Sequence, residues 1–443
     1  MIKVTLRPVV LNISQQQEED RVMKKMKQLS LGLVLGLLTF ALLCSGAYAK
    51  DAVIGFTGPL SGPGAGYGRD CVNGLQMAAE DINKAGGITV KGKKYQIKLE
   101  TYDDMIRPPE AVNNARRLVA RSGAVVIFNP VFNTIAPLMQ INEQAGSEFL
   151  MMAYSSTPKI EEIPNSLTTS VPPPFTAYVR AFSEIAWSKG WRKGAMVVTL
   201  GAYGDEWRHA FKEHWISLGG QITADKPANY YTETDFSAQL SAALATDPEF
   251  MLIGGPSEPT GLVIEQARNL GFKGGFILVD QAKQDYIADV VFKGNLSKMN
   301  NVIGVAAVAN VPSQISDRFN ADYNKRFKVH NTFEAILHYS AMYLVAAAME
   351  KAGSVDDPRA IKAAIANVVP QDPAQVPAVY LGTLKTKLLV AATVGVIEDN
   401  QYKKTYQYIW WAKDKPAFEI IKKALAEQSD IETRWMPLEG YLQ

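Results

Sequence analysis

The stretch Asp51–Asn83, DAVIGFTGPLSGPGAGYGRDCVNGLQMAAEDIN, decides the fold. It opens with a short apolar run, residues 53–56, of the kind that forms a buried strand. A glycine-rich turn follows at residues 57–68, and apolar residues then recur at helical spacing from Leu75 to Ile82. Strand, glycine turn and helix predict the first unit of a parallel α/β sheet, in which free backbone N–H groups at the start of the helix can meet a ligand.

The glycine turn does not match a dinucleotide-binding fingerprint. No three of its glycines fit G-x-G-x-x-G, and the acidic pair Asp103-Asp104 lies too far along the chain to be the ribose partner. We therefore expect no nucleotide cofactor, and the sequence predicts no other cofactor.

The same stretch resembles the opening of the periplasmic leucine/isoleucine/valine-binding proteins, the substrate-binding subunits of ABC importers for amino acids and amides. The match reads Gly58-Pro59-Leu60-Ser61-Gly62-Pro63, Ala65, Tyr67-Gly68, Asn73-Gly74, Asp81-Ile82-Asn83 and residues 85–88, and it continues in order to about Leu381. The resemblance implies a type I periplasmic binding protein: two doubly wound, Rossmann-like α/β lobes joined by a three-strand hinge.

The order of predicted elements agrees with two such lobes. Buried strands and helices alternate from residue 53 to residue 153, which is typical of a doubly wound parallel sheet. Three prolines at 172–174 interrupt this pattern, and a second α/β series begins at Ala195. We expect residues 51–170 with 309–380 to form the first lobe, and residues 171–308 with 381–443 the second. The aromatic residues of the tail, from Tyr402 to Trp411, predict a strand packed on the second lobe.

Residues 1–49 are predicted to be an N-terminal extension and a secretory signal peptide. Lysines at 24, 25 and 27 precede the apolar run Leu31–Leu43, which is shorter than the roughly 20 residues that span a bilayer. Cleavage is expected after Ala49, which places the mature protein in the periplasm. A lipid anchor on Cys44 is not expected, because Leu43 stands where a lipobox has a small residue. Met23 and Met26 are alternative translation starts.

Charge and cysteine content argue against binding to nucleic acid or membranes and against a reactive thiol. The whole chain has a formal charge of +2, and residues 1–49 hold six basic and three acidic residues, so the mature chain would carry −1. This balance gives no electrostatic basis for binding nucleic acid or an anionic membrane. The mature chain keeps one cysteine, Cys71, which falls on the apolar face of the first helix and is expected to be a buried, inert thiol.

Signatures of catalysis and metal binding are missing from the sequence. It contains neither G-x-S-x-G nor H-E-x-x-H, and His209 and His214 are five residues apart, which does not stack them on one helix face. We expect His338 to be a core histidine, no metal site, and a binding protein, not an enzyme. A secreted amide hydrolase that uses Asp280 and a serine is the rival from another class, and turnover of a bound ligand would identify it.

Candidate binding residues lie where the predicted strands end, which is where open α/β sheets bind ligands. Position alone does not separate them from helix caps and solvated loop residues. The candidates are Tyr67, Phe132, Asn133, Thr134, Tyr154, Ser155, Ser156, Tyr203 and Asp280.

The resemblance assigns roles to these positions. It implies that first-lobe hydroxyls and backbone, at Tyr67, Tyr154 and Ser156, hold the α-carboxylate of an amino acid. Together with Asn133, these residues are expected to hold the carboxylate and the side chain of the ligand. It also implies that Tyr203 and Asp280 of the second lobe hold the α-ammonium, after which the closed protein docks to the membrane permease of an ABC importer. An α-amino acid, branched-chain or otherwise apolar, is the ligand that the family suggests.

Two departures from the family pattern concern the ligand. The serine-rich turn of the family reads Phe132-Asn133-Thr134 here, and Pro256-Ser257-Glu258 replaces the usual aromatic residue. An amide, a urea-like compound or a small aromatic acid is therefore an alternative ligand. A ligand-sensing periplasmic receptor component is an alternative role.

Overall fold

The computed structural model describes residues 51–62, 64–311, 313–426 and 431–441, together with Arg21 and Lys24. The predicted signal peptide, its cleavage site and Cys44 lie outside the described residues. Among the described residues, no helix combines the length and the apolar character needed to cross a bilayer.

The first sheet has seven strands and is parallel except at one edge. The stretch quoted above forms β1 (Ala52–Gly58), which pairs in parallel with β4 and β5, while β13 and β14 form an antiparallel hairpin. In spatial order the strands are β13 (Gly382–Leu384), β14 (Lys387–Leu389), β7 (Thr168–Ser170), β6 (Leu150–Ala153), β5 (Val126–Asn129), β1 and β4 (Ile97–Asp103).

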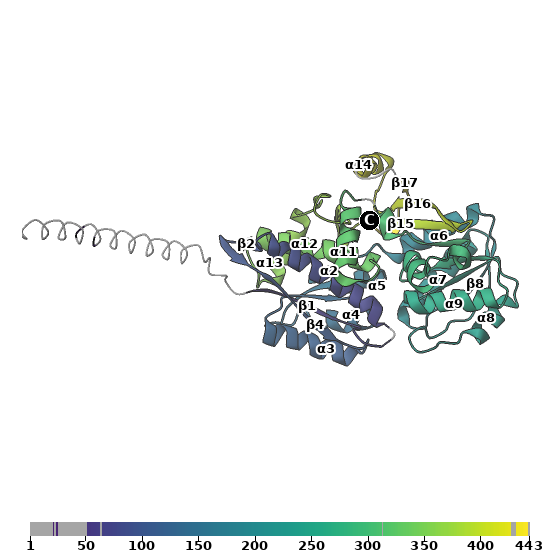
Figure 1. The fold of residues 1–443 in the computed structure, drawn as a ribbon, viewed down its shortest axis with the longest axis horizontal. Coiled ribbons are helices and arrows are strands. Elements are labelled where there is room, and N and C mark those ends of the chain that lie inside the picture. The colour runs from purple at the N-terminus through teal and green to yellow at the C-terminus, as the bar shows by residue number, and fades with distance from the viewer. Residues whose placement is uncertain are drawn as a thin grey trace, which may run out of the picture. The chain divides into compact units, whose positions relative to one another are not determined.

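Helices cover both faces of this sheet, as the alternation of buried residues requires (Figure 1). Ile54 and Phe56 of β1 pack with α2 (Ala65–Lys84) and α12 (Phe333–Ala352), whereas Val53 packs with α3 (Pro108–Arg117) and α4 (Phe132–Met139). The sheet with its helices is called the first lobe here. It also includes α5 (Lys159–Glu162), α11 (Ser316–Phe327), α13 (Pro358–Ala364) and the hairpin of β2 (Ile88–Val90) and β3 (Lys93–Tyr95).

The second sheet repeats the design with eight strands, of which β15 is antiparallel to both its neighbours. In spatial order they are β17 (Glu432–Trp435), β16 (Gln401–Ile409), β15 (Ala392–Glu398), β12 (Val302–Val305), β11 (Gly275–Leu278), β10 (Phe250–Gly254), β8 (Lys193–Val198) and β9 (Gln221–Asp225). This sheet and its helices are called the second lobe. The helices are α6 (Phe175–Ser188), α7 (Ala202–Ser217), α8 (Ser237–Leu244), α9 (Ser257–Asn269), α10 (Gln284–Tyr286) and α14 (Lys415–Ala426).

Short helical turns complete the chain. Two are π-helical, η1 (Leu118–Ser122) and η2 (Ile287–Val291), and four are 3-10 turns: η3 (Leu296–Met299), η4 (Val308–Asn310), η5 (Ile365–Asn367) and η6 (Glu439–Tyr441).

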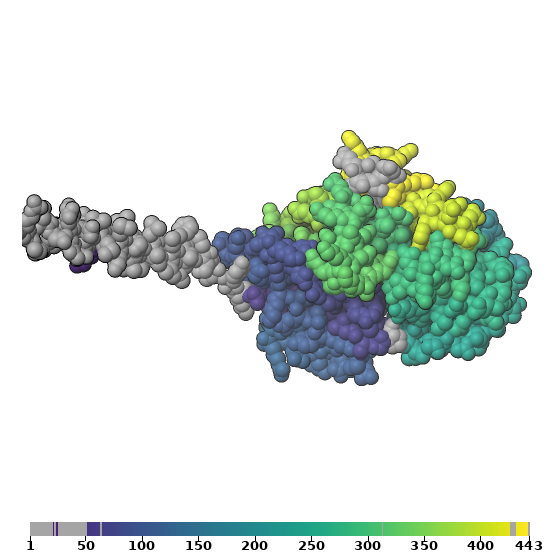
Figure 2. All heavy atoms as spheres, viewed as in Figure 1, coloured from purple at the N-terminus to yellow at the C-terminus, as the bar shows by residue number. Residues whose placement is uncertain are grey.

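Two parallel α/β sheets confirm the predicted fold class, and the aromatic tail forms β16 in the second sheet, as expected. Figure 2 shows these C-terminal residues, in yellow, lying against the teal second lobe. One boundary differs from the expectation. Residues 382–389 pair with the first sheet, where Lys387 lies in register with Ser170, so the last crossing between sheets falls between Leu389 and Ala392 and not near Leu381. The other lobe boundaries stay predictions.

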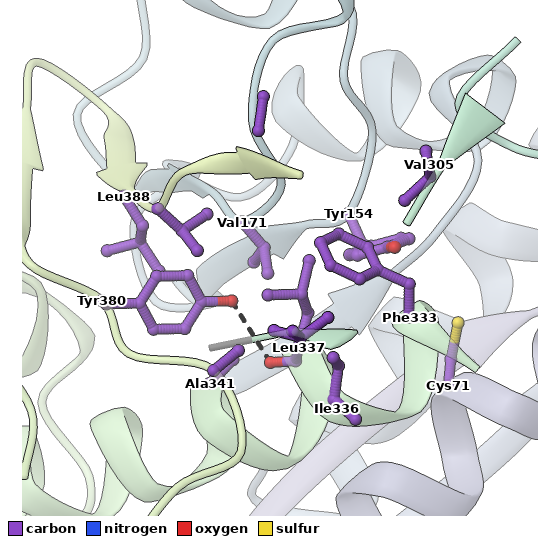
Figure 3. Packing of buried hydrophobic residues seen from close by; sticks show 14 of the residues in the cluster. Cys71, Tyr154, Val171, Val305, Phe333, Ile336, Leu337, Ala341, Tyr380 and Leu388 are labelled. Carbon is purple, nitrogen blue, oxygen red and sulfur yellow. Dashed lines mark hydrogen bonds between the residues drawn. The ribbon is translucent and has the colours of Figure 1, made fainter. Parts of the chain in front are cut away.

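One hydrophobic cluster contains residues of both lobes. Figure 3 shows part of it, with Tyr154 of the first lobe and Val305 of β12, and with the Tyr380 hydroxyl donating to the carbonyl of Leu337 at 3.2 Å. Cys71 belongs to this cluster and is fully buried, as predicted. The two sheets are thus joined by packed side chains as well as by crossing strands.

Candidate functional site

Seven of the nine predicted residues line one cavity of about 50 Å³ at the carboxyl ends of strands from both sheets. They are Tyr67, Phe132, Tyr154, Ser155, Ser156, Tyr203 and Asp280. Because parallel strands bring the residues that follow them to one edge of a sheet, segments far apart in the sequence meet here.

The first-lobe wall begins with Tyr67 in the first turn of α2. Its hydroxyl donates to the carbonyl of Pro130 at 3.2 Å, and its ring lies 6.3 Å from that of Tyr154. The next residue, Gly68, is required here, because a Cβ atom at this position would lie 1.7 Å from the carbonyl oxygen of Pro59. The glycine allows the helix to start directly against the preceding loop and so brings Tyr67 to the cavity.

Ser155 and Ser156 form the hydroxyl-bearing part of the same wall. They come just after β6, separated from it by Tyr154, and both are buried. The carbonyl of Ser156 accepts from the backbone N–H of Phe175 at 2.8 Å, which ties this segment to the start of α6. Buried hydroxyls beside a cavity can donate to a ligand carboxylate.

Asn133 and Thr134 do not line this cavity. Helix α4 begins at Phe132, so the three residues form a helical turn and only Phe132 faces the cavity. Thr134 is buried, and its hydroxyl donates to the Asn129 side chain at 2.9 Å, while Asn133 is exposed beside an adjoining cavity of about 680 Å³. The structure gives Thr134 a packing role, and a part for either residue in binding stays a prediction.

The second-lobe wall contains a carboxylate held by neutral donors. Asp280 follows β11, and one of its oxygens accepts from the indole N–H of Trp207 at 2.8 Å and from the hydroxyl of Tyr203. Burial, and then the neighbouring Asp280 charge, raise the pKa of the Tyr203 hydroxyl well above its ordinary value, so it stays a donor. Among the described residues, no Lys, Arg or His side chain lies within the 4 Å of an ion pair with this carboxylate.

The cavity is also lined by four residues with polar side chains that sequence analysis did not single out: Tyr231, Gln281, Lys283 and Glu334. The ammonium of Lys283 lies 2.7 Å from the carboxylate of Glu334, and their side chains are only 5% and 2% exposed. Lys283 follows β11 and Glu334 lies in the first turn of α12, so this ion pair joins the two lobes. The one sequence feature that pointed to this pair was a glutamate in the first turn of a largely apolar, alanine-rich helix.

His338, one turn further along α12, is a core residue, as predicted. It is fully buried, its Nδ1 lies 2.8 Å from the carbonyl of Glu334, and burial lowers its pKa to about 4. Nowhere in the described part of the chain do three His, Cys, Asp or Glu side chains gather as a metal site would require.

Known proteins match this chain over most of its length. The Rhizobium johnstonii Leu/Ile/Val-binding protein BraC3 is 27% identical over 341 residues, which cover 75% of this chain and 89% of that protein. A Pseudomonas aeruginosa leucine-, isoleucine-, valine-, threonine- and alanine-binding protein is 26% identical over 353 residues, covering 78% of this chain and 90% of that protein.

Solved structures share the fold. The branched-chain amino acid transporter substrate-binding protein of Streptococcus pneumoniae, in complex with isoleucine, superposes with a TM-score of 0.69 at 20% identity, over 81% of this chain and 99% of that chain. A solute-binding protein of an ABC transporter from R. palustris, in complex with benzoate, superposes with a TM-score of 0.68 at 15% identity. The superposition covers 80% of this chain and 95% of that chain.

The profile of the family described as "Periplasmic binding protein" matches residues 52–381, which is well over half of the chain. The match begins at β1 and ends just before the β13–β14 hairpin. The resemblance seen in the glycine-rich stretch is confirmed, and this chain belongs to the periplasmic binding protein family.

Proposed function

We propose that this protein captures a free α-amino acid between its two lobes and delivers it to the membrane permease of an ABC importer from the periplasm. The observation that carries the proposal is the Asp280 carboxylate, which is fixed by two neutral donors and paired with no cation among the described residues. Asp280 is partly buried, and a carboxylate drawn out of water without a cationic partner is destabilised, so a ligand ammonium would supply the missing partner.

The opposite wall suits the other end of an amino acid. Ser155 and Ser156 supply hydroxyls, and they belong to the first lobe, whereas Asp280 belongs to the second. A ligand that contacts both walls binds the closed arrangement better than an open one, and only such a difference in affinity can shift the equilibrium towards closure.

A small aromatic acid is the second candidate, because a neighbour in fold binds benzoate. Its carboxylate would suit the serine wall equally well. It would also bring no cation to Asp280, so this candidate leaves the charge of the second-lobe wall uncompensated.

A thermal-shift screen of the secreted protein, unfolded and refolded to remove co-purified ligand, tests the proposal. The panel holds the amino acids, short amides, urea and benzoate. Ligand at 100 times its dissociation constant stabilises a protein by about 2.7 kcal/mol, so we expect a clear rise in Tm with at least one amino acid.

Asp280→Asn should abolish that rise, and Glu213→Gln, which alters an exposed second-lobe carboxylate, should leave it unchanged. A rise with benzoate or amides alone, or one that survives Asp280→Asn, would overturn the proposed ligand class.

A further inference from the structure

The Lys283–Glu334 ion pair stands inside the candidate cavity. Both residues line it together with Asp280 and the two serines, and both are almost completely buried. Lys283 is held in place, because its ammonium also donates to the backbone carbonyl of Asp280 and its backbone N–H donates to the Ser257 hydroxyl at 2.9 Å. The pair is thus a fixed part of the cavity wall, beyond the groups that would grip the carboxylate and the ammonium.

We propose that this pair is the surface that the ligand side chain meets, and that it selects an α-amino acid with a short, uncharged polar side chain, a hydroxyl or a carboxamide, over a branched apolar one. The inference rests on the proposed function and adds the class of side chain to it.

Charge complementarity favours a neutral polar group. A charged side chain of either sign would meet a like and an opposite charge together, so it gains little net attraction from a pair that is already compensated. A carboxamide or hydroxyl both donates and accepts, so it can donate to the Glu334 carboxylate and accept from the Lys283 ammonium. A branched apolar side chain offers the pair no hydrogen bond and keeps water from it.

A second buried group points to the same class of ligand. The amide nitrogen of Gln281 donates to the Tyr231 hydroxyl at 3.3 Å, but its amide oxygen is buried and has no hydrogen-bond partner among the described residues. Gln281 lines the same cavity. A ligand with an additional donor can satisfy this oxygen, whereas leucine or isoleucine leaves it unpaired.

The size of the cavity favours a short side chain. Its volume is about 50 Å³, and one water molecule needs roughly 10–15 Å³, so only a small group fits inside it. A longer side chain would have to extend past Phe132 and Tyr203 into the adjoining cavity of about 680 Å³. Tyrosine rings from both lobes enclose it, Tyr67 and Tyr154 on one side and Tyr203 and Tyr231 on the other.

Isothermal titration of the secreted protein with serine, threonine, asparagine, glutamine, leucine, isoleucine, aspartate and lysine tests the inference. We expect the best hydroxyl or carboxamide ligand to bind at least about tenfold more tightly than leucine. In the double variant Lys283→Met/Glu334→Leu this ratio should fall by at least tenfold.

The matched control is Lys159→Met/Glu206→Leu. It removes another ion pair between the lobes, at 2.9 Å, whose residues do not line the cavity. It should lower all affinities together and leave the ratio unchanged. A change of ratio in the control as large as in the double variant would overturn the inference, because selectivity would then follow from closure alone.

Leucine binding as tightly as the best polar ligand would overturn the inference while leaving the proposed function intact. Binding of no amino acid by the wild type would instead refute the proposed function itself, and the inference with it. The wild-type ranking decides the matter even if the double variant fails to fold.

Discussion

Two acidic residues line the same cavity, but only one of them has its charge compensated by a cation of the protein. Asp280 is held by the neutral donors Tyr203 and Trp207, and its charge has no cationic partner among the described residues. Glu334 is paired with Lys283 of the other lobe at 2.7 Å and is only 2% exposed. The first carboxylate is oriented but keeps its charge available, whereas the second has its charge compensated within the protein.

The difference teaches how one small cavity can serve two purposes. An oriented, uncompensated carboxylate attracts a ligand cation, and the neutral donors fix the direction from which it must approach. A compensated carboxylate offers hydrogen bonds without a net charge. Removing the hydrogen-bond or ion-pair partners of Asp280 and of Glu334 in turn would test whether the two carboxylates differ in this way.

Lys283→Met should have the largest effect, because it leaves the buried Glu334 without its partner in the closed form. Removing one partner of a buried pair costs about 3–5 kcal/mol, so titration should show ligand affinity lower by two orders of magnitude or more. The free energy of unfolding should fall by less, since open lobes let Glu334 reach water. Glu334→Gln in the same background should recover part of the affinity. Equal losses in affinity and in unfolding free energy would contradict this expectation, because Glu334 would then be equally short of a partner with and without ligand.

Tyr203→Phe should have a smaller effect at the other acid. It removes one donor to the Asp280 carboxylate, and a hydrogen bond to a charged group contributes about 1.5–3 kcal/mol. We expect the binding free energy of the amino-acid ligand, measured by titration, to weaken by roughly that amount, which is at least about tenfold in the dissociation constant. Tyr231→Phe is the matched control, because Tyr231 lines the same cavity but bonds to the neutral Gln281. An equal loss in both variants would show that the Asp280 bond has no special part.

The smallest effect, on the free energy of unfolding, is expected at His330. This residue precedes Glu334 by four positions in the chain. Its ring nitrogens lie 3.5 Å from the carboxylate of Asp285 and 3.8 Å from that of Asp289. Burial lowers the pKa of His330, but the bond to Asp285 and the charges of both aspartates outweigh it, so the pKa is raised. The stabilisation is therefore complete below the unfolded pKa of about 6.5 and is lost as the pH rises through the folded value.

His330→Gln should accordingly lower the free energy of unfolding by about 1 kcal/mol at pH 6 and have little effect at pH 9, as measured by urea denaturation. His209, which pairs with Glu213 at 3.7 Å and is 83% exposed, supplies the control His209→Gln, and this change should have little effect on the free energy of unfolding. A loss that is the same at both pH values would rule out the charged imidazole as its cause.

Sequence reasoning predicted those residues of the candidate cavity that follow directly from strands. Tyr154, Ser155 and Ser156 come straight after an unbroken apolar strand, and Asp280 closes another, so sheet geometry alone brings them to one edge. It placed Asn133 and Thr134 less well, because it did not foresee that α4 begins at Phe132. The third crossing was expected too early for a similar reason, since the short β13–β14 hairpin carries no strong periodic pattern.

The Lys283–Glu334 pair could not be predicted because its partners are far apart in sequence and lie in different lobes. Glu334 stands in a largely apolar helix, but Lys283 has no local pattern that indicates burial, and a lysine or a glutamate in a sequence is ordinarily exposed. Their pairing depends on how the two lobes meet, which local periodicity does not encode.

The fully buried Cys71 can be used to measure local opening of the core by thiol labelling. Burial raises the pKa of its thiol well above the ordinary value, and it lies on the face of α2 that packs in the cluster shared by both lobes. A thiol reagent can reach it only when that packing opens. The rate of labelling therefore measures the free energy of local opening, and comparing the rates with and without ligand would show how far occupancy of the cavity rigidifies the core behind it.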